Sequence, residues 1–232
     1  MSIRLITFDL DDTLWSVQPV IVAADNTLRA WLADHAVDLG ALTAERLQQL
    51  RSEVVQQQPE LDRRVSELRY QVLLRALLQS GYAMREAHEM AEQAFQVFLA
   101  ARQNVEFFAD VVPTLEQLHR QYMLGALSNG NADVRRVGLG EYFSFALNAD
   151  MLGVAKPEPQ VFLAALARAQ VKPGHSIHIG DHPHDDIFGA QQVGMRTIWF
   201  NPEGQAWSGE REPDAQFSQI SQLPDLIKRL DE

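Results

Sequence analysis

The pattern of hydrophobic and polar positions divides the chain into three stretches. The first, Ile3 to Leu14, begins as an apolar run and ends abruptly in carboxylates, which is typical of a buried parallel strand. Between Trp15 and Phe108, apolar residues recur at helical spacing and no strand pattern occurs. Past Phe108, strand and helix patterns alternate to the end of the chain. The sequence therefore predicts a helical segment inserted after the first strand of an α/β domain.

The inserted segment is predicted to contain four helices. The first begins near Val20, Thr43 can cap the second, and Pro59 ends that second helix. The other two are expected over residues 66–80 and 84–103. The apolar stripes of these helices indicate the core of a four-helix module rather than a cofactor site.

The alternating part is predicted to form a Rossmann-like, three-layer core, with a parallel sheet covered by helices on both faces. Helices are expected over residues 113–121, 132–139, 159–170, 186–193 and 223–230, and strands over residues 122–127, 145–148, 176–179, 196–200 and 215–218. We expect an α/β core domain of residues 1–14 and 109–232, and a helical cap domain of residues 15–108 that lies above the catalytic end as a lid.

Composition narrows the function. The formal net charge of −11 argues against nucleic acid or an anionic membrane as a main partner. With no cysteine, neither a disulfide framework nor a thiolate zinc site is possible. The chain starts directly with a core strand and has no apolar run long enough to span a bilayer, so we expect a soluble cytoplasmic protein, either a monomer or a homodimer.

Asp9 and Asp11 follow the first strand and are two residues apart. On an extended backbone both carboxylates would project to the same side and repel each other. A hard cation such as magnesium, a shared proton or a basic partner would stabilise them. The alternative is an acidic turn that caps a helix, because Asp and Thr are good N-cap residues.

Polar residues also end the second strand and surround a rigid turn. Ser128, Asn129 and Gly130 offer a hydroxyl and exposed backbone amides, which can form an anion-binding nest or an ordinary turn. Lys156 precedes the Pro-bounded start of a helix, so a fixed turn could direct its ammonium group into the crevice, although a single lysine is usually solvated.

The last polar stretch follows the strand near Ile179. Asp181 lies at the tip of that strand, and Asp186 lies where the next helix is expected to begin, so either Asp185 or Asp186 could act as its cap. A transition-metal site would be a further alternative, formed by the group His178, His182 and His184. We favour hydrogen-bonded structural roles for these histidines.

Together these four stretches resemble the four motifs of the haloacid dehalogenase-like superfamily in order and spacing, and the helical insertion resembles its first class of cap. The resemblance implies that Asp9 is a nucleophile that forms an aspartyl-phosphate and that Asp11 is the general acid and base. It implies that Lys156 tempers charge in the transition state. Members that remove halide from carbon lack the second aspartate, so dehalogenation is not expected.

The resemblance also implies a Mg²⁺ site. Asp9, Asp181 and the backbone carbonyl of Asp11 would be its direct ligands, and Asp186 would lie outside them, reached through water or paired with Lys156. Asp185 departs from the family, because many relatives have Asn there, and its effect on the metal is open. The hydroxyls and amides expected to bind the phosphoryl group or orient the nucleophile belong to Thr13, Ser128, Asn129 and Gly130.

The motif around Asp9, the Ser128 turn and the segment Gly138 to Phe143 are similar to bacterial phosphatases acting on flavin mononucleotide and its phosphorylated pyrimidine precursor in riboflavin synthesis. A phosphosugar mutase or a non-catalytic binding protein of the same fold remains an alternative. Substrate choice is expected to lie in the cap and beside Trp15, although for each residue singly we favour packing for Trp15 and a solvated position for arginines such as Arg69.

Overall fold

The computed structural model describes residues 2–36, 39 and 42–231. The chain forms two compact units, one comprising Met1–Ser16 with Val105–Glu232 and the other comprising Val17–Asn104. Within the described residues, no helix is both long enough and apolar enough to traverse a bilayer.

The larger unit contains a six-stranded sheet in which every neighbouring pair is parallel, in the order β3-β2-β1-β4-β5-β6. The strands are β1 (Leu5–Phe8), β2 (Met123–Ser128), β3 (Phe145–Asn148), β4 (Ser176–Gly180), β5 (Arg196–Phe200) and β6 (Ala215–Phe217). Strand β2 lies next to β1 and β3 lies at the edge beyond β2, and the chain then crosses to β4 on the other side of β1. The ends of β1 and β4 therefore flank the point where the strand order reverses, which is where open α/β sheets bind ligands.

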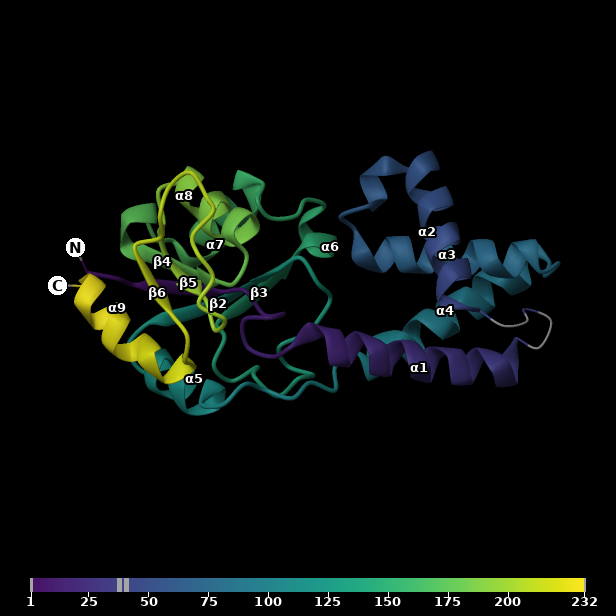
Figure 1. The fold of residues 1–232 in the computed structure, drawn as a ribbon, viewed down its shortest axis with the longest axis horizontal. Helices are drawn as coiled ribbons and strands as arrows, with labels where there is room; N and C mark the ends of the chain where they lie inside the picture. The colour runs from purple at the N-terminus through teal and green to yellow at the C-terminus, as the bar shows by residue number, and fades with distance from the viewer. Residues whose placement is uncertain (1, 37–38, 40–41, 232) are drawn as a thin grey trace. The chain divides into compact units, whose positions relative to one another are not determined.

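Helices cover both faces of this sheet, with α5 and α9 along one side and α7 and α8 along the other (Figure 1). The helical elements are α5 (Val111–His119), α6 (Ala149–Leu152), α7 (Pro159–Ala169), η3 (Pro173–His175), the π-helical η4 (Pro183–Phe188), α8 (Gly189–Gln192), η5 (Ile220–Gln222) and α9 (Leu223–Asp231). On the α7 face, Leu5, Leu127 and Phe145 pack against Phe162 and Leu166. The predicted three-layer α/β fold is confirmed.

One predicted element is wrong. The segment over residues 132–139 forms consecutive turns instead of a helix. Val134, Val137 and Leu139 are buried, but Gly138 has φ +92° and the backbone bonds do not form a helical ladder. A positive φ is incompatible with a right-handed helix, so the apolar spacing indicated burial and not helix.

The smaller unit consists of α1 (Val17–His35), α2 (Ala44–Gln57), the short η2 (Pro59–Leu61), α3 (Val65–Gln79) and α4 (Met84–Ala101). Thr43 caps α2, as predicted, by accepting a hydrogen bond from the backbone N–H of Arg46. One hydrophobic cluster joins α1, α3 and α4 around Phe98, and a second joins α2 to α3 around Leu50.

Arg69 lies inside this helical unit rather than on its solvated face. Its Nη1 donates to Asp25 Oδ1 at 2.6 Å, and its guanidinium carbon lies 3.5 Å from the centre of the Phe98 ring. The side chains of Arg69 and Asp25 are 27% and 23% exposed. Arg69 therefore joins α1, α3 and α4 through one ion pair and one cation–π contact.

Candidate functional site

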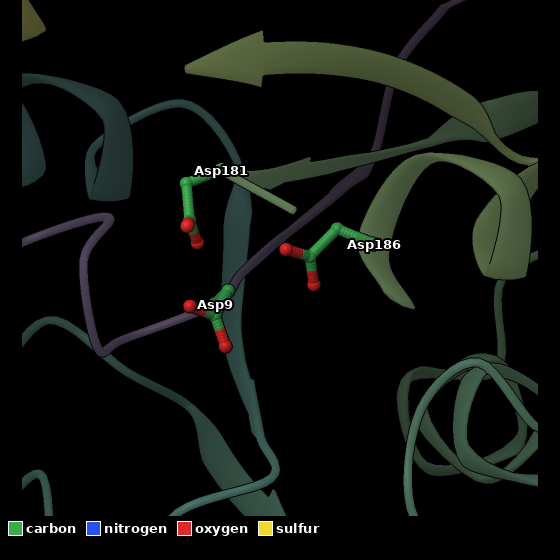
Figure 2. A group of neighbouring side chains, drawn as sticks. All are labelled: Asp9, Asp181 and Asp186. Atoms are coloured by element: carbon green, nitrogen blue, oxygen red, sulfur yellow. The ribbon is translucent and has the colours of Figure 1, made fainter. Parts of the chain in front are cut away.

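Three carboxylates converge at the carboxyl ends of β1 and β4 (Figure 2). Asp9 directly follows β1, Asp181 directly follows β4, and Asp186 lies in η4. One oxygen of each lies within 4.8 Å of the others, and this is the group of acidic side chains in the described part of the chain that could hold a metal ion. The backbone N–H of Asp9 donates to Ile179 O at 2.8 Å, which continues the pairing of β1 with β4 up to the site.

Lys156 supplies the positive charge of this cluster. Its Nζ lies 2.5 Å from Asp9 Oδ1 and 2.6 Å from Asp186 Oδ1, and its side chain is 2% exposed. Asp186 and Asp9 raise the pKa of Lys156 above its usual value, although burial acts to lower it. The ammonium is therefore held in its charged form between two carboxylates.

One ammonium does not balance these three carboxylates, of which two are buried and Asp181 is half-buried, and this leaves a formal charge of −2 when all four groups are ionised. Burial raises the pKa of Asp9 well above its usual value against the influence of Lys156. Burial and the charge of Asp186 raise the pKa of Asp181 to about 7. A divalent cation would cancel this excess negative charge, so the residues present fit such an ion.

Asp186 is the least available of the three as a ligand. Its Oδ1 accepts hydrogen bonds from Lys156 Nζ and from His178 Nε2 at 3.1 Å, and its Oδ2 accepts one from the backbone N–H of His182 at 3.0 Å. Although burial opposes the effect, Lys156 and His178 hold the pKa of Asp186 far below its usual value. A Cβ on Gly180 would come within 2.3 Å of the Asp186 carboxyl group, so the glycine makes room for this carboxylate.

The predicted phosphoryl-binding residues lie on the loop after β1, at the end of β2 and on the loop that follows β2. Thr13 is buried, and its Oγ1 lies 3.2 Å from both Asp9 Oδ2 and Asp181 Oδ1. The hydroxyl can donate to only one of them at a time. Ser128 Oγ accepts a hydrogen bond from the backbone N–H of Gly130 at 2.9 Å, which leaves the hydroxyl proton for another acceptor. The Asn129 side chain contacts the backbone of Lys156 and, at 3.4 Å, Asp185 Oδ2.

Asp11 does not belong to the carboxylate group around Asp9. Strand β1 ends at Phe8, and the chain turns at Asp12, which has φ +59°. Because this turn follows both residues, the projection of the two carboxylates to one side stays a prediction. Asp11 Oδ1 accepts a hydrogen bond from Trp15 Nε1 at 2.8 Å.

The three histidines of the last motif have structural contacts. His178 lies in β4 and is fully buried between Thr7, Phe162 and Asp186. His182 is the N-cap of η4 and accepts a hydrogen bond from the backbone N–H of Asp185, so the expectation that Asp185 or Asp186 caps this helix is wrong. The ring of His184 stacks on Phe188.

Three residues that support the site are not among the predicted site residues. They are His178, which binds Asp186, Trp15, which binds Asp11, and Trp199, whose Nε1 donates to the backbone oxygen of Asp181 at 2.7 Å. Each carries one polar N–H on its ring, and a strand pattern marks the rings of His178 and Trp199 as buried. A buried donor of this kind requires an acceptor, so the acids that follow the strands could have indicated that these rings contact the site.

A model of the haloacid dehalogenase-like hydrolase family matches residues 3–194. The chain belongs to this family. Among curated relatives of this hydrolase, the 5-amino-6-(5-phospho-D-ribitylamino)uracil phosphatase YigB of Escherichia coli is 32% identical over 97% of the chain and 96% of its own length. The phosphoserine phosphatase of Thermus thermophilus is 29% identical over 67% of the chain and 63% of its own length.

Among solved structures, one described as a 2-haloacid dehalogenase from Pseudomonas syringae pv. tomato superposes on this hydrolase with a TM-score of 0.94. It is 51% identical and covers 98% of this chain and 99% of its own. The predicted family is confirmed, and the prediction of an enzyme that hydrolyses phosphoric monoesters agrees with the two phosphatase relatives.

Proposed function

We propose that this hydrolase cleaves phosphomonoesters of small metabolites through an aspartyl-phosphate formed on Asp9. The observation that carries the proposal is the buried Asp9–Lys156 contact of 2.5 Å at the reversal point of the sheet, with a second acid, Asp11, two residues further on. Asp9 is nucleophilic in its ionised form, and Lys156 offsets the negative charge that gathers around phosphorus during transfer.

In the proposed reaction, an Asp9 oxygen attacks phosphorus as the bond from phosphorus to the ester oxygen breaks. Asp11 gives its proton to that oxygen, so the product leaves as an alcohol. Asp11 then takes a proton from the water that attacks the acyl phosphate, which releases inorganic phosphate and restores Asp9. Thr13 orients Asp9, and Ser128 with the amides of Asn129 and Gly130 supplies donors to the phosphoryl oxygens.

The cation proposed for the site is Mg²⁺. Asp9, Asp181 and the backbone oxygen of Asp11 would hold it, because oxygen ligands with retained waters are its usual surroundings. When bound, it would supply positive charge beside the phosphoryl oxygens. Asp186 would act through its contact with Lys156, and Asp185 through Asn129 and the adjacent turn.

The substrate proposed first is 5-amino-6-(5-phosphoribitylamino)uracil, with flavin mononucleotide as a second. The similarity to YigB over 97% of the chain supports this choice. Residues 15–108 are proposed as the cap that selects the substrate, in a cytoplasmic protein that is a monomer or a homodimer.

A second candidate function is hydrolytic dehalogenation of a 2-haloacid, which the description of the Pseudomonas syringae relative favours. The chemistry of Asp11 separates the two candidates. An alkoxide leaving group needs a proton, whereas halide is a weak base and leaves without one. A general acid beside the nucleophile is therefore useful for phosphate esters and dispensable for carbon–halogen bonds.

The experiment measures phosphate release from a panel of phosphomonoesters that includes both proposed substrates, and halide release from 2-chloropropionate, with Mg²⁺ and with chelator. We expect phosphate release that requires Mg²⁺ and is abolished in Asp9→Asn and reduced in Asp11→Asn. Halide release that survives Asp11→Asn would replace the proposal with the second candidate. Conversion of a phosphosugar into its isomer would identify a mutase, and no turnover by folded protein would favour a binding role.

A further inference from the structure

The indole of Trp15 is fully buried and donates its only polar hydrogen to the Asp11 carboxylate at 2.8 Å. We propose that Trp15 is a positioning residue that orients Asp11 for proton transfer. This inference rests on the proposed phosphatase function, in which Asp11 is the general acid and base. Because the ring is fully buried, it cannot present a face to the ring of a substrate.

The backbone around Trp15 fixes both partners of this hydrogen bond. Leu14 N donates to Leu10 O at 2.8 Å and Asp12 N donates to Trp15 O at 2.7 Å, so the chain folds back tightly between the acid and the indole. Trp15 also forms a β-bridge to Phe107, and the two rings lie 5.9 Å apart. The donor is therefore held from two directions, and its position does not depend on the carboxylate.

A buried indole N–H needs an acceptor, and in this structure a carboxylate oxygen provides it. The charge of the acceptor strengthens the bond and defines the plane of the carboxyl group. A surface aspartate samples several rotamers, and only one of them directs its proton toward the leaving oxygen. The hydrogen bond from Trp15 holds Asp11 in one rotamer before the substrate binds, which lowers the entropic part of the barrier.

The leaving group makes the role measurable. An alkyl phosphate releases a strongly basic alkoxide and depends on the proton from Asp11, whereas p-nitrophenyl phosphate releases a weakly basic phenolate that depends on it much less. The ratio kcat/KM reports the steps up to departure of the leaving group. Loss of orientation at Asp11 therefore lowers kcat/KM for the alkyl ester and largely spares the aryl ester.

The variant Trp15→Phe removes the N–H and keeps an aromatic ring, and Phe107→Leu disturbs the packing of Trp15 but keeps the N–H. We expect Trp15→Phe to lower kcat/KM by about tenfold or more for the alkyl phosphate and by less than about threefold for p-nitrophenyl phosphate. Phe107→Leu, which keeps the N–H and changes only its packing, should lower kcat/KM for the alkyl ester relative to the aryl ester by less than Trp15→Phe does. Equal losses on the two substrates in Trp15→Phe, or no loss on either, would overturn the inference.

A readout independent of turnover tests the contact itself. In ¹⁵N-labelled protein, the indole resonance that disappears in Trp15→Phe belongs to Trp15. We expect this resonance to move in Asp11→Ala, which removes the acceptor, and to move less in Asp11→Asn, which keeps a neutral oxygen acceptor there. If the position of the Trp15 indole resonance does not change in Asp11→Ala, the contact is refuted. If the Trp15 resonance moves in Asp11→Ala as expected but the wild-type protein has no phosphatase activity, the contact stands and the proposed function is refuted instead.

Discussion

The side chain of Asn129 holds the backbone of Lys156 from both sides. Its Oδ1 accepts from Lys156 N at 2.7 Å, and its Nδ2 donates to Lys156 O at 3.0 Å. Both polar atoms of the amide are thus used to fix the residue whose ammonium contacts Asp9. The Asn129 side chain acts on the site through Lys156, so the proposed contact of Asn129 with a phosphoryl group is left to its backbone N–H.

We expect Asn129→Ala to lower kcat by roughly 10- to 100-fold, because a displacement of about 1 Å at a charged catalytic group has effects of this size. Asn129→Asp keeps the shape and an acceptor for Lys156 N, but it places a carboxylate oxygen against Lys156 O and should be impaired as well. Steady-state kinetics with a phosphomonoester measures both variants. Wild-type kcat in Asn129→Ala would show that the lysine is held by other contacts.

A second prediction concerns His178, which joins the sheet to Asp186. Burial lowers the pKa of His178, so the ring is neutral, and a carboxylate at 3.1 Å from Nε2 requires the proton on that nitrogen. Nδ1 then accepts from Thr7 Oγ1 at 2.8 Å. His178→Leu leaves both neighbours without this partner, and we expect it to lower the free energy of unfolding by about 1–3 kcal/mol and to reduce kcat.

The matched variant for this position is His178→Gln, whose amide N–H can still reach Asp186. It should keep more of the stability and of kcat than His178→Leu does, as measured by urea unfolding and steady-state kinetics. If the two variants lose the same amount of both, the effect belongs to packing of the ring and not to the hydrogen bond.

Strands β1 to β5 were predictable because each is a short, largely apolar run ended by Gly, Asn or Asp, whereas β6 is only Ala-Gln-Phe and is followed by Ser218. The helices were predictable where apolar spacing agreed with caps, as at Thr43, and the prediction over residues 132–139 failed where spacing was the only support. There the buried residues Val134 and Val137 are three positions apart, as on one face of a helix, but Gly138 adopts a positive φ. Periodicity records which residues are buried, and backbone conformation is a separate requirement.

The acids of the site were found from the sequence because they follow strand ends, and β1 and β4 are neighbours at the reversal of the sheet. The groups that hold these acids could not be found in this way. His178 contacts Thr7 across 171 positions of sequence, and Asn129 contacts Lys156 across 27. Such partners are selected by packing between distant segments, which no local pattern records. Trp15, only four residues from Asp11, was within reach of local reasoning.

A third prediction concerns the excess negative charge around Asp9 and Asp181. Mg²⁺ at a hundred times its dissociation constant should stabilise the folded protein by about 2.7 kcal/mol, which raises Tm by roughly 5–10 °C for a chain of this size. Chelator should reverse the shift. Thermal unfolding with Mg²⁺ and with chelator gives both values.

The control for this measurement uses two acids that follow β4, Asp181 directly after the strand and Asp185 in η4. Asp181→Asn should remove most of the Mg²⁺-dependent shift, because Asp181 is one of the three converging carboxylates. Asp185→Asn should keep it, because the contacts of Asp185 are to Asn129 and His184. A shift that persists in Asp181→Asn would place the cation elsewhere.

The last prediction separates a buried ion pair from an exposed one within the helical unit. Arg69 and Asp25 are mostly buried and lie 2.6 Å apart, with Phe98 beneath the guanidinium, whereas Arg51 and Asp62 lie 2.8 Å apart with 46% and 56% of their side chains exposed. Asp25→Asn keeps the shape but leaves the charge of Arg69 without its counterion, so we expect it to lower the free energy of unfolding by about 1–2 kcal/mol. Asp62→Asn should change it by less than about 0.5 kcal/mol, because water already screens that pair. Urea unfolding followed by far-ultraviolet circular dichroism compares the two, and equal losses would mean that Arg69 is stabilised by its contact with Phe98 and not by Asp25.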